Sequence, residues 1–270
     1  MRPIFRWAGG KRNSAEQIAA IVNANGNAYN KRLISPFLGA GSFELEALRI
    51  GLARSAWLAD ACEPVISVFT MLRDAKVWKR ARVMLEAFQQ MSEADQRAHF
   101  LETRGATADW FLFLIRQACS VQGIWRVSKK EGKYNVPFSH AAHFALDELE
   151  RSATLLQSLP VTLACCDFAQ TVAQAEDGDL VFADPPWSGT HSAYTREGFG
   201  DLDHLRLMSA LQAAKARGAD CWVMGSDCAE TRETYAPVGR HQTVYELQVR
   251  NNVSPKASGR GMRTDLLIHL

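Results

Sequence analysis

The segment Asp184-Pro-Pro-Trp187 holds the residues whose types and spacing are best suited to chemistry. Proline has no N–H, so Pro185 and Pro186 leave rigid backbone carbonyl acceptors, and Asp184 adds a carboxylate. Trp187 supplies a flat face on which a planar ring can stack. Such a pocket suits the exocyclic amino group of a base, because accepting both of its hydrogens frees the nitrogen lone pair to attack an electrophile. A purely structural Pro-Pro turn is the less favoured interpretation.

A glycine turn, Phe37-Leu-Gly-Ala-Gly41, precedes a segment of helical periodicity. Gly39 and Gly41 would let a ligand approach the backbone closely at the N-terminus of that helix. Glu44 stands where a dinucleotide fingerprint has its third glycine, so this turn is not that fingerprint. Taken alone, a Gly-x-Gly segment is more often a plain tight turn.

Two further acids follow expected strands. Asp60 ends the second strand, at a position where an acid commonly accepts hydrogen bonds from ribose hydroxyls. Asp167 and Phe168 follow a later strand, where a polar acceptor beside an aromatic ring suits an adenine. Each acid has a structural alternative: Asp60 is nearly as readily a buried or capping residue, and Asp167 is more readily a helix N-cap.

The elements that must position these residues alternate along the chain. Strands are expected at 32–36, 55–59, 161–165, 179–183, 221–225, 243–249 and 265–270, and helices at 14–22, 42–50, 64–73, 141–158, 202–217 and 229–236. Ser14 and Gln17 form a capping-box pattern at the first helix. This alternation predicts an α/β fold with a mostly parallel sheet, helices on both faces and an antiparallel pair at the end. The four features then share the carboxyl edge of the sheet, where such folds bind ligands.

Residues 76–140 interrupt the alternation. The stretch 76–120 is mostly helical in pattern, and 121–140 is basic, aromatic and rich in turn-forming residues. We therefore expect residues 76–140 to form an inserted second domain, with residues 1–75 and 141–270 forming the α/β domain.

Composition excludes several classes of protein. The 270 residues are 47% hydrophobic and 22% charged, which is a globular balance rather than a disordered one. No apolar stretch is long enough to span a membrane, and the N-terminus lacks the apolar region of a signal peptide. The six cysteines form no CxxC pair, so buried thiols in a reducing compartment are expected.

The net charge of +2 conceals an uneven distribution. Segments 1–12, 116–133 and 240–264 each carry four more basic than acidic residues, so the rest of the chain has ten more acidic than basic residues. If the three segments converge in space, they form a phosphate-binding surface; the alternative is scattered solvated loops.

An ordered set of motifs resembles one known family. The set comprises Phe5-Arg-Trp-Ala-Gly-Gly-Lys11, Pro36-Phe-Leu-Gly-Ala-Gly-Ser42, Val121-Gln-Gly-Ile-Trp-Arg126, Gly132-Lys-Tyr-Asn-Val-Pro137, Asp184-Pro-Pro-Trp187 and Gly225-Ser-Asp227. It is similar to the Dam-type (D12 class, alpha group) family of DNA adenine-N6 methyltransferases, from Phe5 to about Leu267. Trp187 stands where tyrosine is commoner, Gln122 replaces the asparagine of an Asn-Gly turn, and Ser128 replaces another asparagine.

The resemblance implies a class I S-adenosylmethionine-dependent methyltransferase sheet (Rossmann-like) with an inserted, mostly helical DNA-recognition domain carrying a β-hairpin. Adenine would flip out of double-stranded DNA, stack on Trp187 and donate its N6 hydrogens to Asp184 and the Pro185 carbonyl. The methyl group would pass directly to N6, without a metal. The residues implied to hold S-adenosylmethionine are Trp7, Lys11, Phe37, Gly39, Gly41, Ser42, Asp60 and Asp184, with Asp167 and Phe168 at its adenine.

The same resemblance implies DNA contacts and a short site such as GATC. Arg126 matches a base-reading arginine, which can bond guanine O6 and N7 together. Ile124 matches an apolar residue that fills the gap left by the flipped base, and Arg6 stands where relatives often carry lysine. The remaining expected DNA contacts are Gln122, Lys129, Lys130, Lys133, Pro137, Arg250, Lys256 and Arg260.

Two rival functions stay open from sequence. Cytosine-N4 methyltransferases also methylate an exocyclic amine, although Asp184 favours adenine over the serine common in those enzymes. A DNA-binding homologue without catalysis is opposed by the presence of Lys11, Asp60 and Asp184. His140 and His143 have the spacing of metal ligands but lack a third ligand. An enzyme in the cytoplasm of a prokaryotic cell, or encoded by its phage, is expected, and it is expected to be a monomer, with a dimer as the alternative.

Overall fold

A computed structural model describes most of the chain. The described residues are 3–7, 9–11, 13–26, 32–105, 109–128, 130–187, 199–237, 242–251 and 261–270, without the side chains of Gln122, Arg250 and Asn251. Among these residues, no helix is both long and apolar enough to cross a lipid bilayer.

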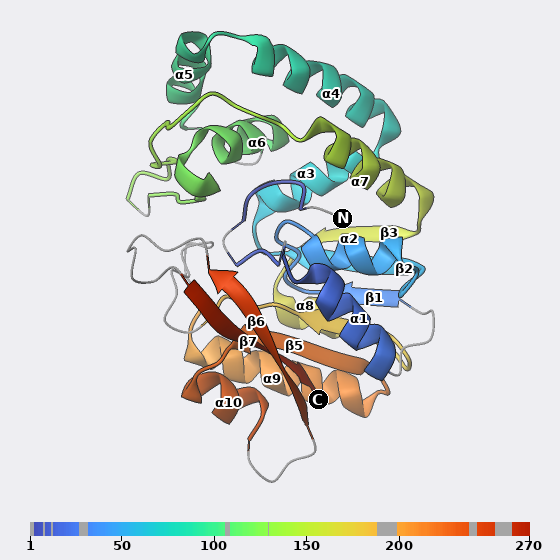
Figure 1. Ribbon diagram of the computed structural model, residues 1–270. Coiled ribbons are helices and arrows are strands. Elements are labelled where there is room, and N and C mark those ends of the chain that lie inside the picture. The colour runs from blue at the N-terminus through green and yellow to red at the C-terminus, as the bar shows by residue number, and fades with distance from the viewer. Residues whose placement is uncertain are drawn as a thin grey trace.

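One sheet forms the centre of the molecule (Figure 1). Its order is β3-β2-β1-β4-β5-β7-β6, and the first five of these strands run parallel. β7 runs antiparallel to both β5 and β6. The strands are β1 (Arg32–Ser35), β2 (Ser55–Asp60), β3 (Val161–Cys165), β4 (Leu180–Ala183), β5 (Asp220–Ser226), β6 (Thr243–Asn251) and β7 (Gly261–His269). This is the mostly parallel sheet with an antiparallel pair at its end that the sequence predicts.

Helices cover both faces of the sheet. α1 (Ala15–Asn25), α2 (Ser42–Arg49), α3 (Glu63–Arg73) and α7 (Leu146–Ser158) contribute to one large apolar cluster. α8 (Phe168–Val172), α9 (Asp201–Ala216) and α10 (Ala229–Tyr235) surround a second, smaller cluster. Because both faces are covered, the buried strands are continuous apolar runs. In Leu180–Ala183, for example, every residue is buried.

The expected insertion consists of helices that stand above the sheet in Figure 1. It contains α4 (Ala75–Gln90), α5 (Glu93–Glu102), α6 (Trp110–Cys119) and the short 3-10 helix η1 (Val121–Gly123). Its buried rings, including Phe88, Phe100 and Phe113, belong to the same apolar cluster as α2 and α3. The apolar core of the insertion is therefore continuous with that of the sheet domain.

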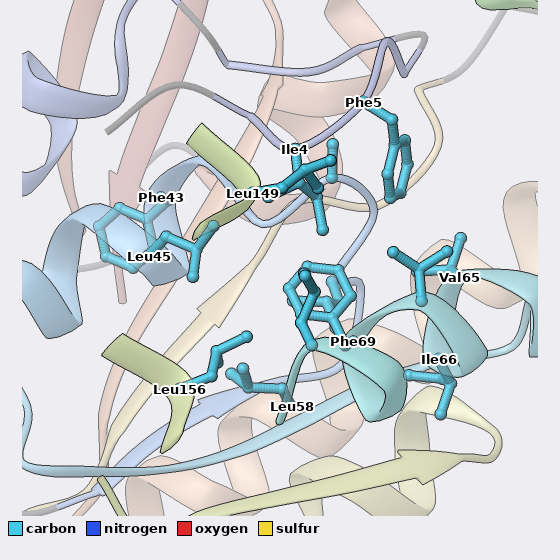
Figure 2. Packing of buried hydrophobic residues seen from close by; sticks show 14 of the residues in the cluster. Ile4, Phe5, Phe43, Leu45, Leu58, Val65, Ile66, Phe69, Leu149 and Leu156 are labelled. Carbon is cyan, nitrogen blue, oxygen red and sulfur yellow. The ribbon is translucent and has the colours of Figure 1, made fainter. Parts of the chain in front are cut away.

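The N-terminal segment enters that shared core. Ile4 and Phe5 lie above Phe69 of α3, as Figure 2 shows. Phe5 also packs edge-on against Phe113 of α6, with ring centroids 5.0 Å apart. The residues just after Phe5 are thereby fixed between the sheet and the helical insertion.

The segment after η1 folds back on itself. Val127 and Tyr134 form an antiparallel bridge, the Ser128 amide donates to the Lys133 carbonyl, and the Asn135 amide donates to the Arg126 carbonyl. The Tyr134 hydroxyl donates to the Ile124 carbonyl at 2.8 Å. This is the expected hairpin, although it is held by single bridges rather than by regular strands.

The capping box predicted at Ser14 is wrong. Ser14 precedes α1, but its side chain makes no capping hydrogen bond. Side-chain caps are formed by Asp74 at α4, Ser92 at α5, Asp109 at α6 and Asp167 at α8, each of which accepts from backbone amides of the first turn.

Element lengths and thiol burial also differ from expectation. β6 runs two residues further than expected, to Asn251, and β7 begins at Gly261 rather than at 265, because polar residues of an antiparallel pair continue the ladder beyond the apolar core. The short helix α8 lacks a long periodic pattern and was expected only through the N-cap alternative at Asp167. All six cysteines are free, but Cys165 on the edge strand β3 is exposed rather than buried.

Candidate active site

The candidate site lies at the carboxyl edge of the sheet, between β1 and β4. The strand order reverses here. β1 pairs with β2 on one side and with β4 on the other, and later strands are added outward in both directions. Such a switch point is where open α/β sheets bind ligands. Residues 36–41 leave β1 at this point, and residues 184–187 leave β4.

An ion pair joins the N-terminal motif to the segment after β4. The Lys11 ammonium donates to both carboxylate oxygens of Asp184, at 2.7 and 2.6 Å, and to the Gly9 carbonyl at 2.7 Å. These three acceptors match the three N–H donors of an ammonium group. The Lys11 side chain is buried and that of Asp184 is about one-fifth exposed at 19%, so the pair is shielded and the Asp184 carboxylate is fixed in place.

Trp187 lies beside this ion pair. The Lys11 nitrogen is 4.6 Å from the centre of the Trp187 ring, a distance at which a cation is attracted to the π-system. The Arg263 guanidinium of β7 lies at the same distance, 4.6 Å from the ring centre. Arg263 in turn forms an ion pair with the buried Asp265, with Nε and Oδ1 2.9 Å apart.

Asp60 ties the glycine turn to the end of β2. One of its carboxylate oxygens accepts from the Gly39 amide and the other from the Cys62 amide, both at 2.8 Å. Burial raises the pKa of Asp60 to about 6, against the lowering effect of these two hydrogen bonds. Each oxygen has a second lone pair, so Asp60 can still accept from a hydroxyl group.

The glycines of the turn allow close approaches that other residues would block. A Cβ at Gly39 would lie 2.9 Å from the Trp7 indole, and one at Gly41 would lie 2.7 Å from the Phe69 ring. Gly41 also has a φ of +69°, which L side chains rarely adopt. Trp7 is therefore placed directly against the turn, and Gly41 lets α2 start immediately after it.

A buried carboxyl lies at the start of α2. Glu44 accepts a hydrogen bond from the Ser35 hydroxyl at 2.7 Å, and burial raises its pKa to about 8. The Asp184 charge raises this pKa further, whereas Lys11 lowers it. Glu44 is therefore protonated near neutral pH and adds no second negative charge beside Asp184.

Phe37, Asp167 and Phe168 come together at the far side of the turn. The Phe37 and Phe168 rings stack with centroids 5.6 Å apart, and Phe199 packs edge-on against Phe37 at the same centroid distance. Asp167 caps α8 by accepting from the Ala169 amide and also bonds Arg206 of α9 at 3.1 Å. The capping alternative for Asp167 is thus confirmed, and its expected role at an adenine stays a prediction.

Arg6 brings the N-terminal segment to the hairpin. A Cβ at Gly123 would lie only 2.6 Å from Arg6 Cβ, so the two backbones are in close contact. Ile124, the next residue, is exposed, and so is Arg126, whose Nε donates to the Asn135 side chain at 2.7 Å. The exposed side chains of Lys130, Lys133 and Pro137 belong to the same segment.

Some expected DNA-binding residues cannot be placed. Lys129, Lys256 and Arg260 lie outside the described residues, as do the side chains of Gln122 and Arg250.

Members of the three basic segments meet at two places. Lys11 from the first segment and Arg263 from the third share the Trp187 ring, and Arg6 from the first contacts Gly123 of the second. Arg116 of the second segment is instead buried, with its guanidinium donating to the Thr103 carbonyl. Parts of the basic segments therefore converge, although some of their charges hold the fold together.

Sequence reasoning missed four residues of the site. Arg263 and Asp265 were seen only as part of a basic loop and an apolar strand, Glu44 only as a departure from a glycine motif, and Arg206 not at all. An acid directly before an apolar run, as in Asp265-Leu-Leu-Ile268, is the one sequence signal that points to a buried functional carboxylate.

A comparison with known protein families identifies the family of this chain. The model for D12 class N6 adenine-specific DNA methyltransferases matches residues 7–251. The chain belongs to this family. The match spans every motif of the site from Trp7 to Trp187, so the family and the adenine-N6 activity expected from sequence are confirmed for this methyltransferase.

Known relatives resemble the methyltransferase along its whole length. The Type II methyltransferase M1.LlaDCHI of Lactococcus lactis subsp. cremoris is 21% identical, over 99% of this chain and 95% of that protein. The retron Ec67 DNA adenine methylase of Escherichia coli is 26% identical, over 99% of this chain and 90% of that protein. The DNA N-6-adenine-methyltransferase of Escherichia phage P1 is 30% identical over 98% of this chain, which spans 35% of that longer protein.

Proposed function

We propose that this methyltransferase takes the methyl group of S-adenosylmethionine and places it on N6 of an adenine that has flipped out of double-stranded DNA. The observation that carries the proposal is the set of contacts at the carboxyl edge of β4. There Lys11 fixes the Asp184 carboxylate, and the Trp187 ring lies within reach of the same ammonium group.

Each residue of this set has a role in presenting the amino group. Trp187 stacks on the flipped adenine, while Asp184 and the Pro185 carbonyl accept its N6 hydrogens; Pro186 keeps the turn rigid. Lys11 prevents Asp184 from rotating, because both carboxylate oxygens are bonded to it. The N6 lone pair is then directed away from the ring system, and methylation needs no covalent enzyme intermediate and no metal.

The residues around the glycine turn fit S-adenosylmethionine. The Ser42 hydroxyl is buried and has no hydrogen-bond partner among the described residues, and Asp60 keeps spare acceptor capacity toward ribose hydroxyls. Trp7, Phe37, Gly39 and Gly41 line the same turn, with Asp167 and Phe168 beyond Phe37. When bound, this cofactor supplies a methyl group activated on a sulfonium.

The DNA is proposed to lie across Arg6, Ile124 and the exposed hairpin. Residues 76–140 act as the recognition unit and residues 1–75 and 141–270 as the catalytic unit. Arg126 reads a guanine, Ile124 fills the gap that the adenine leaves, and GATC is the proposed site. The enzyme acts as a monomer in the cytoplasm of a prokaryotic cell or of a cell infected by its phage.

Substitution of Asp184 tests this assignment. Asp184→Ala should lower methyl transfer by on the order of 10²-fold or more, because the amino group loses its main acceptor, while affinity for DNA persists. Asp184→Asn keeps a partner for the buried Lys11 and controls for loss of folding. Transfer of tritium from labelled S-adenosylmethionine and gel-shift titration of DNA measure the two properties. Turnover retained by both folded variants would remove Asp184 from the mechanism.

A further inference from the structure

Two cations share the ring on which the target base is proposed to stack. The Lys11 nitrogen and the Arg263 guanidinium carbon each lie 4.6 Å from the centre of Trp187, and the ring is only 8% exposed. A base that stacks on Trp187 must therefore replace part of what covers it. The two cations over the ring are candidates for the group that yields.

Lys11 is held too firmly to be that group. Its side chain is 4% exposed, and its ammonium bonds Asp184 twice and the Gly9 carbonyl once. Moving it would break the ion pair that fixes Asp184 and would leave a buried charge without its partners. The proposed chemistry requires this ion pair to stay in place.

Arg263 is held more loosely. Its side chain is 37% exposed, and although Nε lies 2.9 Å from Asp265 Oδ1, neither of these two atoms makes a hydrogen bond of good geometry. The second approach, from Nη2 to Oδ2, is 3.5 Å long. Asp265 itself is 1% exposed. Its carboxylate stays in place and can still attract the positive charge of Arg263 while the guanidinium moves.

We propose that the guanidinium of Arg263 occupies the stacking position of the target base on Trp187 and is exchanged for that base when it flips out of the duplex. This inference rests on the proposed function. A guanidinium is planar and stacks on aromatic faces as a base does, so it can keep the indole in place while no DNA is bound. Arg263 is thus a positioning residue that acts through Trp187.

The exchange has a consequence for selectivity. A base gains the Trp187 face only by giving up the contact between Arg263 and that face, so a weakly stacking base gains little. Adenine also bonds Asp184 and the Pro185 carbonyl in the proposed function, and these bonds favour the exchange. Arg263 therefore disfavours binding of bases that stack weakly on Trp187 or that cannot bond Asp184 and the Pro185 carbonyl.

The test compares two DNA duplexes that differ at one position. Both contain a site at which the wild-type protein methylates adenine, but one carries an abasic nucleotide in place of that adenine. Dissociation constants are measured with S-adenosylhomocysteine, which cannot donate a methyl group. The dissociation constant for the abasic duplex divided by that for the adenine duplex reports how much the base itself contributes to binding. Differences in stability between the two duplexes cancel when protein variants are compared.

Arg263→Ala should raise this ratio about two- to fivefold, the range expected for one cation–π contact. Arg263→Lys keeps a positive charge beside Asp265 but loses the planar group, so it should raise the ratio by a smaller factor. This variant provides the measurement if the alanine variant does not fold. Arg151→Ala, which removes an exposed arginine paired with Glu148 on α7, should leave the ratio unchanged.

An unchanged ratio in both Arg263 variants would overturn the inference, and a lowered ratio would show that Arg263 supports the stacked base instead. The proposed function fails separately: in that case the wild-type protein transfers no methyl group to adenine.

Discussion

At the scale of residues, the site depends on contacts between positions far apart in the chain. Lys11 and Asp184 are 173 positions apart, yet their side chains make two hydrogen bonds. The family resemblance, which rests on the order of the motifs, implied that both positions belong to one pocket. The hydrogen bonds themselves, and the protonated Glu44 beside them, depend on distances that no local pattern encodes.

Arg126 provides a test of base recognition at this scale. It is exposed on the hairpin and holds Asn135 with its Nε, so the Nη groups of its guanidinium can face a guanine. Arg126→Ala should reduce discrimination at one base pair by roughly 1–3 kcal/mol. The measurement is methylation of duplexes with single substitutions across the site.

Lys130→Ala is the matched control for Arg126→Ala. Lys130 is exposed on the same hairpin, and a phosphate contact from it would weaken all duplexes equally. If Arg126→Ala also weakened every duplex by the same factor, Arg126 would be a phosphate contact and not a base reader.

At the scale of elements, the alternation of strands and helices was predictable because the buried parallel strands are short apolar runs with turn residues at their ends. The ranges of β1 and β3 agree with expectation to within a residue, whereas β6 and β7 extend into polar residues that periodicity does not mark. The hairpin was expected from the family order alone, since two isolated bridges leave little periodic signal.

The glycine turn between β1 and α2 gives a prediction at this scale. Gly41→Ala should destabilise the protein by about 1–3 kcal/mol, because a Cβ meets the Phe69 ring and because φ is +69°. It should also weaken binding of S-adenosylmethionine, since the turn would shift. Urea unfolding and calorimetric titration measure the two effects.

Gly51→Ala separates the two causes. Gly51 has a φ of +75°, but a Cβ there would meet nothing within 4 Å. This variant therefore carries the backbone strain without the collision. Equal losses of stability in both variants, with unchanged cofactor binding in Gly41→Ala, would contradict the role given to the turn.

At the scale of the whole molecule, stability should depend on pH through Glu44. Burial raises its pKa to about 8 in the folded state, from about 4.5 for a solvated glutamate. The unfolded chain loses this proton as the pH rises past about 4.5, whereas the folded chain keeps it until about pH 8. The free energy of unfolding should therefore fall across this window.

Glu44→Gln should make the free energy of unfolding less dependent on pH. Between pH 5 and pH 8 the variant should lose at least about 2 kcal/mol less than the wild type, since one pKa unit corresponds to about 1.4 kcal/mol. Urea denaturation at the two pH values measures this difference. Equal losses in variant and wild type would show that Glu44 is ionised in the folded protein.

Charged residues are unevenly distributed over the whole molecule. The net charge of +2 conceals basic segments that meet at Trp187 and at Gly123, while the rest of the chain is acidic. Segment charges were predictable from sequence. Composition alone left open whether the segments converge, because convergence depends on the N-terminal segment passing between the sheet and the helical insertion.

Identification of the methylated nucleoside tests the central claim most directly. The purified protein is incubated with unmethylated double-stranded DNA and S-adenosylmethionine labelled in its methyl group, and the DNA is then digested and its nucleosides are separated. The account predicts label in N6-methyladenine alone. Label in N4-methylcytosine, or no label in DNA, would contradict it.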